Sequence, residues 1–209
     1  CLMCSGQSNM RWMLKDTEGG KEAIAQSANP KLRVFNLAST IHPGSGRFSL
    51  MQLRSTFADN LFETEGWQLA GPESVPDFSG VAYHFGRLLV ENSEVPIGLI
   101  HSGVGGSPME SWIPADKPTA NWLEDGELPK WCQGRAALNL THWRDKSAAP
   151  TPHHPFEPGM LYEAGIEPFT GLGVKGVIWY QGESNATSDG SGSPAMDPKK
   201  NTIVSAGNW

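Results

Sequence analysis

Three short polar turns hold the residues of this chain that could do chemistry. The turns read GQSN, SGVGGS and QGESN, and their candidate residues are one serine, two glycines, two amides and one carboxylate: Ser8, Gly105, Gly106, Gln181, Asn185 and Glu183. A serine hydroxyl can attack an ester carbonyl, and backbone N–H groups and amides can donate hydrogen bonds to the oxyanion that forms. The three turns together predict acyl transfer at one site, provided that the fold brings them to the same place.

Each turn follows an apolar run that is typical of a buried strand. The three runs occupy residues 1–4, 95–102 and 173–180. Continuous apolar strands separated by helical stretches are typical of a parallel sheet that helices cover on both faces. Ligands bind at the carboxyl ends of the strands in such sheets. The pattern therefore predicts an α/β domain in which the three turns meet at one edge of the sheet.

The remaining elements are read from apolar spacing. A further strand is predicted over residues 31–38, a helix is expected to begin near Met10, and residues 20–30 are interpreted as a helix end. The clearest helix is Ser79–Asn92, which Asp77 or Ser79 can cap. Its apolar residues share one face at helical spacing: Val81, Phe85, Leu88 and Leu89. The stretches 39–73 and 116–158 are expected to be largely irregular, with one short helix near residues 136–143.

Each turn also has a purely structural interpretation. Ser8 can simply cap the helix that follows it, and Glu183 can be a solvated loop carboxylate or a helix-start residue. The glycine turn is not a dinucleotide-binding fingerprint, because Pro108 stands where the third glycine is needed, and the chain has no Walker lysine. What favours chemistry is the occurrence of all three turns at strand ends.

Composition excludes several classes of function. The chain has 209 residues, which suffice for one domain with a core, and its formal net charge is −6. No Lys/Arg block indicates a nucleic acid or an acidic membrane surface as partner, and no apolar run is long enough to span a bilayer. Cys1 and Cys4 form a C-x-x-C, but without a second such pair we interpret them as buried strand cysteines rather than a redox pair or half of a zinc site.

The same blocks carry a resemblance to a known family. CSGQSNM, VPIGLIHSGVGGSPMESWIP and GVKGVIWYQGESNA resemble the three signature blocks of the sialate O-acetylesterase domain, a branch of the SGNH/GDSL hydrolases. FSGVAYHFGRLL and PGMLYEAGIEPF resemble connecting pieces of that family. The resemblance implies a three-layer, flavodoxin-like α/β fold with a parallel sheet. It also implies a partial catalytic domain over residues 1–187, followed by an irregular tail over residues 188–209.

The resemblance also implies roles for individual residues. Ser8 is the expected nucleophile, Gly105 or Gly106 is expected to give an oxyanion N–H, and Gln181 or Asn185 is expected to give an amide donor. The implied reaction is hydrolysis of an O-acetyl ester on a sugar through an acyl-enzyme, with release of acetate and no metal or organic cofactor. An extracytoplasmic location (secreted, periplasmic or lysosomal) is implied as well, although the chain begins without a signal peptide.

The general base is the part of this mechanism that the sequence does not supply. Related acetylesterases with a QGE turn use its glutamate as a triad acid, which makes Glu183 a candidate orienter. The family's base is a histidine in an Asp-x-x-His block downstream of that turn, but no histidine follows His154. His101 lies nearest to the predicted site, and a local structural role is expected for it. We therefore expect a domain truncated at both ends, with very little esterase activity of its own.

Two classes of function stay open. The first is a carbohydrate O-acetylesterase that acts on sialic acid or on a plant polysaccharide such as xylan, and the residues do not separate these substrates. The second is a catalytically silent carbohydrate-binding domain that keeps the cleft without the base. A lipid hydrolase is disfavoured because the sequence has no large apolar lid segment. The oligomeric state does not follow from the sequence.

Overall fold

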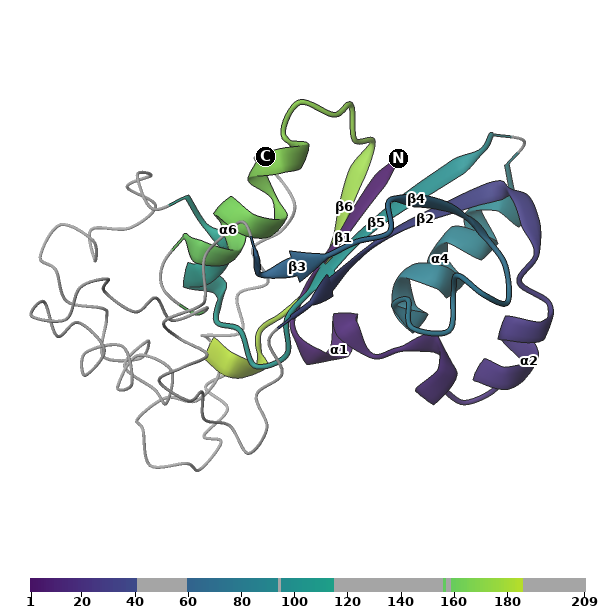
Figure 1. Cartoon of the computed structure of the whole chain (residues 1–209), viewed down its shortest axis with the longest axis horizontal. Helices are drawn as coiled ribbons and strands as arrows, with labels where there is room; N and C mark the ends of the chain where they lie inside the picture. The colour runs from purple at the N-terminus through teal and green to yellow at the C-terminus, as the bar shows by residue number, and fades with distance from the viewer. Residues whose placement is uncertain (41–59, 94, 115–155, 157–158, 186–209) are drawn as a thin grey trace, which may run out of the picture. The chain divides into compact units, whose positions relative to one another are not determined.

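The computed structural model describes five stretches of the chain, which are drawn in colour in Figure 1. The chain divides into two compact units. The described residues are 1–40, 60–93, 95–114, 156 and 159–185. The first unit consists of Cys1–Thr40, Phe62–Gly105 and Phe169–Gln181, and the second of Ile41–Leu61, Gly106–Pro168 and Gly182–Trp209. The helix expected near residues 136–143 and the tail over 188–209 lie outside the described residues, so the domain bounds read from the sequence stay a prediction.

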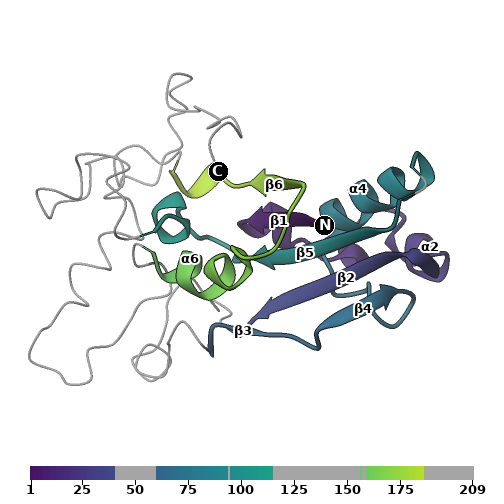
Figure 2. The same ribbon diagram turned by 90° about the horizontal axis from the view of Figure 1, so that it is seen from above.

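The first unit is built on a sheet whose four longest strands are the four that the sequence predicts. They are β1 (Leu2–Gly6), β2 (Asn29–Ser39), β5 (Ile97–Gly103) and β6 (Gly176–Tyr180). All four run parallel in the order β2-β5-β1-β6 (Figure 2). The register pairs Gly6 with both Gly103 and Tyr180, so β1, β5 and β6 end in the same row.

The sequence predicts a wholly parallel sheet, but the observed sheet is mixed. Two short strands, β3 (Phe62–Glu63) and β4 (Trp67–Ala70), run antiparallel to β2. They lie within the stretch expected to be irregular, because strands of two and four residues are too short to give a periodic signal. The order of the parallel strands also differs from the flavodoxin order 2-1-3-4-5, since β5 lies between β2 and β1. The α/β architecture itself is confirmed.

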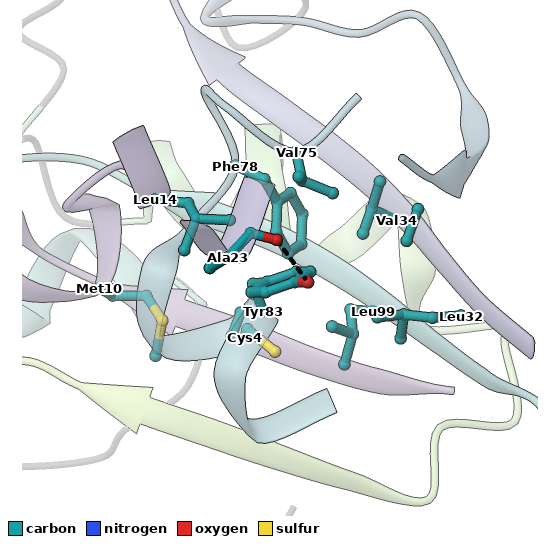
Figure 3. Close-up of a cluster of buried hydrophobic side chains, with 12 residues drawn as sticks. Cys4, Met10, Leu14, Ala23, Leu32, Val34, Val75, Phe78, Tyr83 and Leu99 are labelled. Carbon is teal, nitrogen blue, oxygen red and sulfur yellow. Dashed lines mark hydrogen bonds between the residues drawn. The ribbon is translucent and has the colours of Figure 1, made fainter. Parts of the chain in front are cut away.

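Three helices of the first unit share one hydrophobic core with the sheet (Figure 3). They are α1 (Ser8–Arg11), α2 (Gly20–Ala25) and α4 (Gly80–Glu91). The strands contribute Cys4, Leu32, Val34 and Leu99 to this core, and Met10, Leu14 and Tyr83 come from the helical side. The Tyr83 hydroxyl donates a hydrogen bond to the Ala23 carbonyl at 3.3 Å, which links α4 to α2.

Helix α4 confirms the helix predicted over Ser79–Asn92. Its N-cap residue Ser79 is fully buried, and the Ser79 hydroxyl accepts a hydrogen bond from the Ala82 N–H at 3.1 Å. This bond satisfies one of the amide groups that a helix start leaves without a partner. The Gly80 N–H donates to the Trp12 carbonyl at 2.8 Å. The start of α4 is therefore anchored to the segment that follows α1.

The face of α4 that packs on the sheet is not the face that the sequence predicts. Three residues of the predicted apolar face are exposed instead: Val81, Phe85 and Leu88. The buried positions are the small residues and one tyrosine: Gly80, Ala82, Gly86 and Tyr83. A Cβ at Gly86 would lie 2.5 Å from Leu99 Cδ1, so the helix approaches the strands too closely for a larger residue there. Small residues therefore decide which face is buried.

The described part of the second unit consists mainly of short helical segments. It contains η4 (Met109–Trp112), α6 (Met160–Gly165) and η6 (Glu183–Asn185). Trp112 is 1% exposed, and its indole N–H donates to the Ser107 hydroxyl at 2.9 Å. Phe156 and Leu161 are buried as well.

The two described cysteines differ in their surroundings. Cys4 is buried, and burial raises the pKa of its thiol to about 12, which keeps the thiol protonated and unreactive. Cys1 is exposed, so the prediction of two buried strand cysteines is wrong for this residue. The described residues include no group of three or more His, Cys, Asp or Glu side chains placed to hold a metal ion. None of the described helices combines the length and the apolar character that crossing a bilayer requires.

Candidate active site

The candidate site of the first unit begins where β1, β5 and β6 end. The Gln7 N–H, just after β1, donates to the Tyr180 carbonyl at 2.9 Å, and the Val104 N–H, just after β5, donates to the Gly6 carbonyl at 3.0 Å. These two bonds tie the three strand ends together beyond the last regular pairs. The turns that carry Ser8, Gly105 and Gln181 therefore start from one edge of the sheet, as predicted for an α/β domain.

Gly6 allows this close approach between β1 and β6. A Cβ at Gly6 would lie 2.1 Å from the Tyr180 oxygen, a distance that no side chain can accept. The residue also has a φ of +147°, a backbone conformation that residues other than glycine rarely adopt. The sequence therefore needs glycine here to let the chain turn from β1 into α1.

Ser8 is the first residue of α1 and is exposed to solvent. The N-cap residue is Gln7, and no side chain makes a capping hydrogen bond at this helix start, so the interpretation of Ser8 as a cap is wrong. Within the described part of the chain the Ser8 hydroxyl makes no hydrogen bond. Its own N–H is one of the amides that have no partner inside a helix. The hydroxyl is thus accessible and not engaged in holding the helix.

Gly105 brings bare backbone to Ser8. A Cβ at Gly105 would lie 3.8 Å from Ser8 Cβ and 3.9 Å from Arg11 Nη1. The guanidinium of Arg11 and the side chain of Ser8 therefore both lie within 4 Å of one point beside the Gly105 backbone. Sequence reasoning missed Arg11, although its position three residues after Ser8 on a helix is a signal that the two are neighbours. Its positive charge favours an anion at this point.

The other residues predicted for the site divide between the two units. Gln181 directly follows β6 in the first unit and is half-buried. Gly106, Glu183 and Asn185 belong to the second unit. Within that unit Gly106 has a φ of +76° and lies beside the Phe156 ring, with 3.7 Å from its Cβ position to Phe156 Cζ. Glu183 is exposed at the start of η6. The catalytic roles of all four stay predictions.

His101 has a structural environment. It is 3% exposed, and its Nδ1 lies 2.8 Å from Asn36 Oδ1 on the neighbouring strand. Burial, with a smaller contribution from the positive charge of Arg11, lowers its pKa to about 4. The Nε2 atom would lie 2.8 Å from a Cβ at Gly103, which explains the glycine at that position. A neutral imidazole with so low a pKa is a weak base near neutral pH.

The other histidines add no base within the described residues. His84 lies half-buried on α4, and burial, with the nearby charge of Arg87, lowers its pKa. The remaining histidines of the sequence lie outside the described residues: His42, His142, His153 and His154.

Comparison with known proteins shows what this arrangement is similar to. The chain is 30% identical to the sialate O-acetylesterase of Rattus norvegicus and 29% identical to that of Homo sapiens, over 88% of the chain in both cases. Among solved structures, a carbohydrate acetylesterase from Xanthomonas citri matches 95% of the chain with a TM-score of 0.59 and 26% identity. No family model matches.

These matches cover only part of each relative. The aligned chain spans 35% of the rat protein, 31% of the human protein and 35% of the bacterial structure. The likeness nevertheless extends over nearly all of this chain, in sequence and in fold. The chain belongs to the sialate O-acetylesterase family.

Proposed function

We propose that this chain is the nucleophile-bearing part of a carbohydrate O-acetylesterase. The observation that carries the proposal is Ser8, which is exposed, free of capping bonds and beside the bare backbone of Gly105 at the sheet edge. The names of the relatives support acetylated sugars as the substrate class. Sialic acid and xylan esters are both substrates of this class. An extracytoplasmic location is part of the same proposal.

The proposed reaction has two steps. Ser8 Oγ attacks the acetyl carbonyl carbon, its proton passes to a general base, and the C–O bond to the sugar breaks as the sugar oxygen takes up a proton. Water then attacks the acyl-enzyme, which releases acetate and restores the Ser8 hydroxyl. The N–H groups of Ser8 and Gly105, with the Gln181 amide, are the proposed oxyanion donors in the first unit. Each such donor typically lowers the barrier by about 3 kcal/mol.

Residues of the second unit and a general base have proposed roles as well. Gly106 and Asn185 are the alternative oxyanion donors, and Glu183 is the proposed orienter of the base. We assign the base to a residue other than His101, because the low pKa of about 4 makes His101 a poor proton acceptor near neutral pH.

Labelling with a fluorophosphonate probe tests this proposal directly. Such a probe bonds covalently to a serine that is activated as a nucleophile. We expect mass spectrometry to locate the adduct on Ser8, and we expect no adduct in Ser8→Ala. The control variant Ser74→Ala should label like the wild type, since Ser74 lies in a turn where its hydroxyl bonds the Leu69 carbonyl at 2.7 Å. Absence of a Ser8 adduct in the wild type would contradict the esterase and support the alternative below.

A catalytically silent carbohydrate-binding domain is the second candidate. It is favoured by one observation, that neither described histidine is suited to act as a base near neutral pH, since burial lowers the pKa of both His84 and His101. Such a domain would bind acetylated sugars without releasing acetate. The expectation of very little activity for the 209-residue chain has its own test. Steady turnover of p-nitrophenyl acetate that Ser8→Ala abolishes would contradict that expectation.

A further inference from the structure

The indole of Trp12 is exposed and yet fixed in place. Trp12 directly follows α1 and is 56% exposed, the most exposed tryptophan of the first unit. Its Nε1–H donates to the Asp16 carbonyl at 3.0 Å, and its own carbonyl accepts from the Gly80 N–H at 2.8 Å. Both the ring and the backbone are therefore held. A ligand that meets this ring does not have to pay for ordering it.

Trp12 is exposed on the same side of its segment as Ser8. Ser8 and Trp12 are exposed, whereas Met10 and Leu14 are fully buried in the core. Residues four apart on a helix lie on one face, with their Cβ atoms roughly 6 Å apart. Trp12 is the C-cap residue of α1, so this spacing places the Cβ atoms of Ser8 and Trp12 on neighbouring parts of one exposed surface.

Another exposed tryptophan shows what differs at Trp12. Trp67 on β4 is 44% exposed, but its ring packs edge-on against Phe35, with 5.3 Å between the ring centroids. Among the described residues no aromatic ring packs against Trp12. The exposure of Trp67 is explained by its place at the rim of an aromatic cluster. The packing within this part of the chain gives no such explanation for Trp12.

We propose that Trp12 is a stacking platform for a sugar ring of the substrate, so that it selects carbohydrate esters over small acyl esters. This proposal rests on the proposed function, because it names how that site would recognise its substrate. A pyranose ring has an apolar face of C–H groups that can cover an indole, while its hydroxyls stay in water. A ring stacked on Trp12 is within reach of the surface where Ser8 would meet its O-acetyl group. Trp12 is thus a specificity-determining residue.

Binding measured without turnover tests the platform. Isothermal titration calorimetry would use the Ser8→Ala protein with two probes, an O-acetylated xylotriose and 9-O-acetyl-N-acetylneuraminic acid, to separate the two sugar classes. We expect Trp12→Ala to raise the Kd for at least one probe about tenfold and Trp12→Phe to raise it less. The matched control Trp67→Ala should leave the Kd unchanged. With Ser8 intact, Trp12→Ala should leave fluorophosphonate labelling unchanged and, where turnover is measurable, raise KM for the sugar ester more than it lowers kcat.

The possible results separate this proposal from the proposed function. Equal Kd values for the Trp12→Ala and Trp67→Ala proteins, or no binding of either probe by the parent protein, would overturn the platform. Labelling of Ser8 would still support the nucleophile in that case. Conversely, sugar binding that depends on Trp12 in a protein whose Ser8 never labels would overturn the esterase and leave the platform in place.

Discussion

A fall in pH is expected to destabilise this protein through His101. In the folded protein burial, with the positive charge of Arg11, holds the His101 pKa at about 4, whereas an unfolded histidine titrates near 6.5. Between these two values the unfolded chain binds a proton that the folded chain does not. The free energy of unfolding therefore falls as the pH falls from about 6.5 to about 4, by up to about 3 kcal/mol for this group. Above pH 6.5 the contribution is complete.

The variant His101→Gln isolates this effect. A glutamine amide can still donate to Asn36 Oδ1, but it does not titrate, so the variant should lose the part of the pH dependence that belongs to His101. The assay is urea unfolding followed by circular dichroism from pH 7.5 to pH 4.5. The control His84→Gln should keep most of the pH dependence, because His84 is only half-buried. If the difference in unfolding free energy between wild type and His101→Gln stays constant across this range, the reasoning from burial is wrong.

Three further predictions concern packing in the first unit, and urea unfolding measures all of them. Gly6→Ala should lower the free energy of unfolding by at least about 3 kcal/mol, because its Cβ would lie 2.1 Å from the Tyr180 oxygen. The control Gly71→Ala, where a Cβ meets nothing within 4 Å, should change it by less than about 0.5 kcal/mol. Ser79→Ala removes the cap of α4 and should lower the free energy of unfolding by about 1 kcal/mol. An unchanged free energy of unfolding would contradict the capping role. Phe85→Ser should cost less than about 1 kcal/mol, since Phe85 is 40% exposed; a loss of about 3 kcal/mol would indicate a buried side chain instead.

Features that depend on local pattern could be predicted from the sequence. The strands that become β1, β2, β5 and β6 are each marked by continuous apolar residues, which is the pattern that burial on both faces of a parallel sheet requires. The start of α4 is marked by Ser79, whose hydroxyl satisfies a backbone group within the same turn. In these cases the physical cause lies within a few residues of the signal.

Features that depend on distant contacts could not be predicted in this way. Apolar spacing assigned Val81, Phe85 and Leu88 to the buried face of α4, but the contact with Leu99 selects the face that carries Gly86. The antiparallel strands β3 and β4 form because β2 offers them an edge, and a strand of two residues has no period of its own. Partners far apart along the chain decide both outcomes.

The candidate site was only partly accessible to sequence reasoning for the same reason. The motif indicated Ser8 and the glycine turn, and the topology brings Gly105 beside Ser8 within the first unit. Arg11 and Trp12 were not singled out, because a basic and an aromatic residue in a short helix are unremarkable until their exposure is known. Helical spacing from Ser8 was the available signal for both.

Glycines at the ends of β1 and β5 leave bare backbone, rather than side chains, in the row where these strands end. Gly6 and Gly103 stand in the same row of neighbouring strands, and each excludes a side chain for a different reason. At Gly6 the Tyr180 carbonyl is too close, and at Gly103 the His101 imidazole occupies the space. His101 in turn is held by Asn36 on β2, so a strand that does not pair with β1 helps to shape the end of β5. A larger residue at position 103 is therefore expected to displace α1 as well as the imidazole, because a Cβ there would lie 3.2 Å from the backbone nitrogen of Arg11.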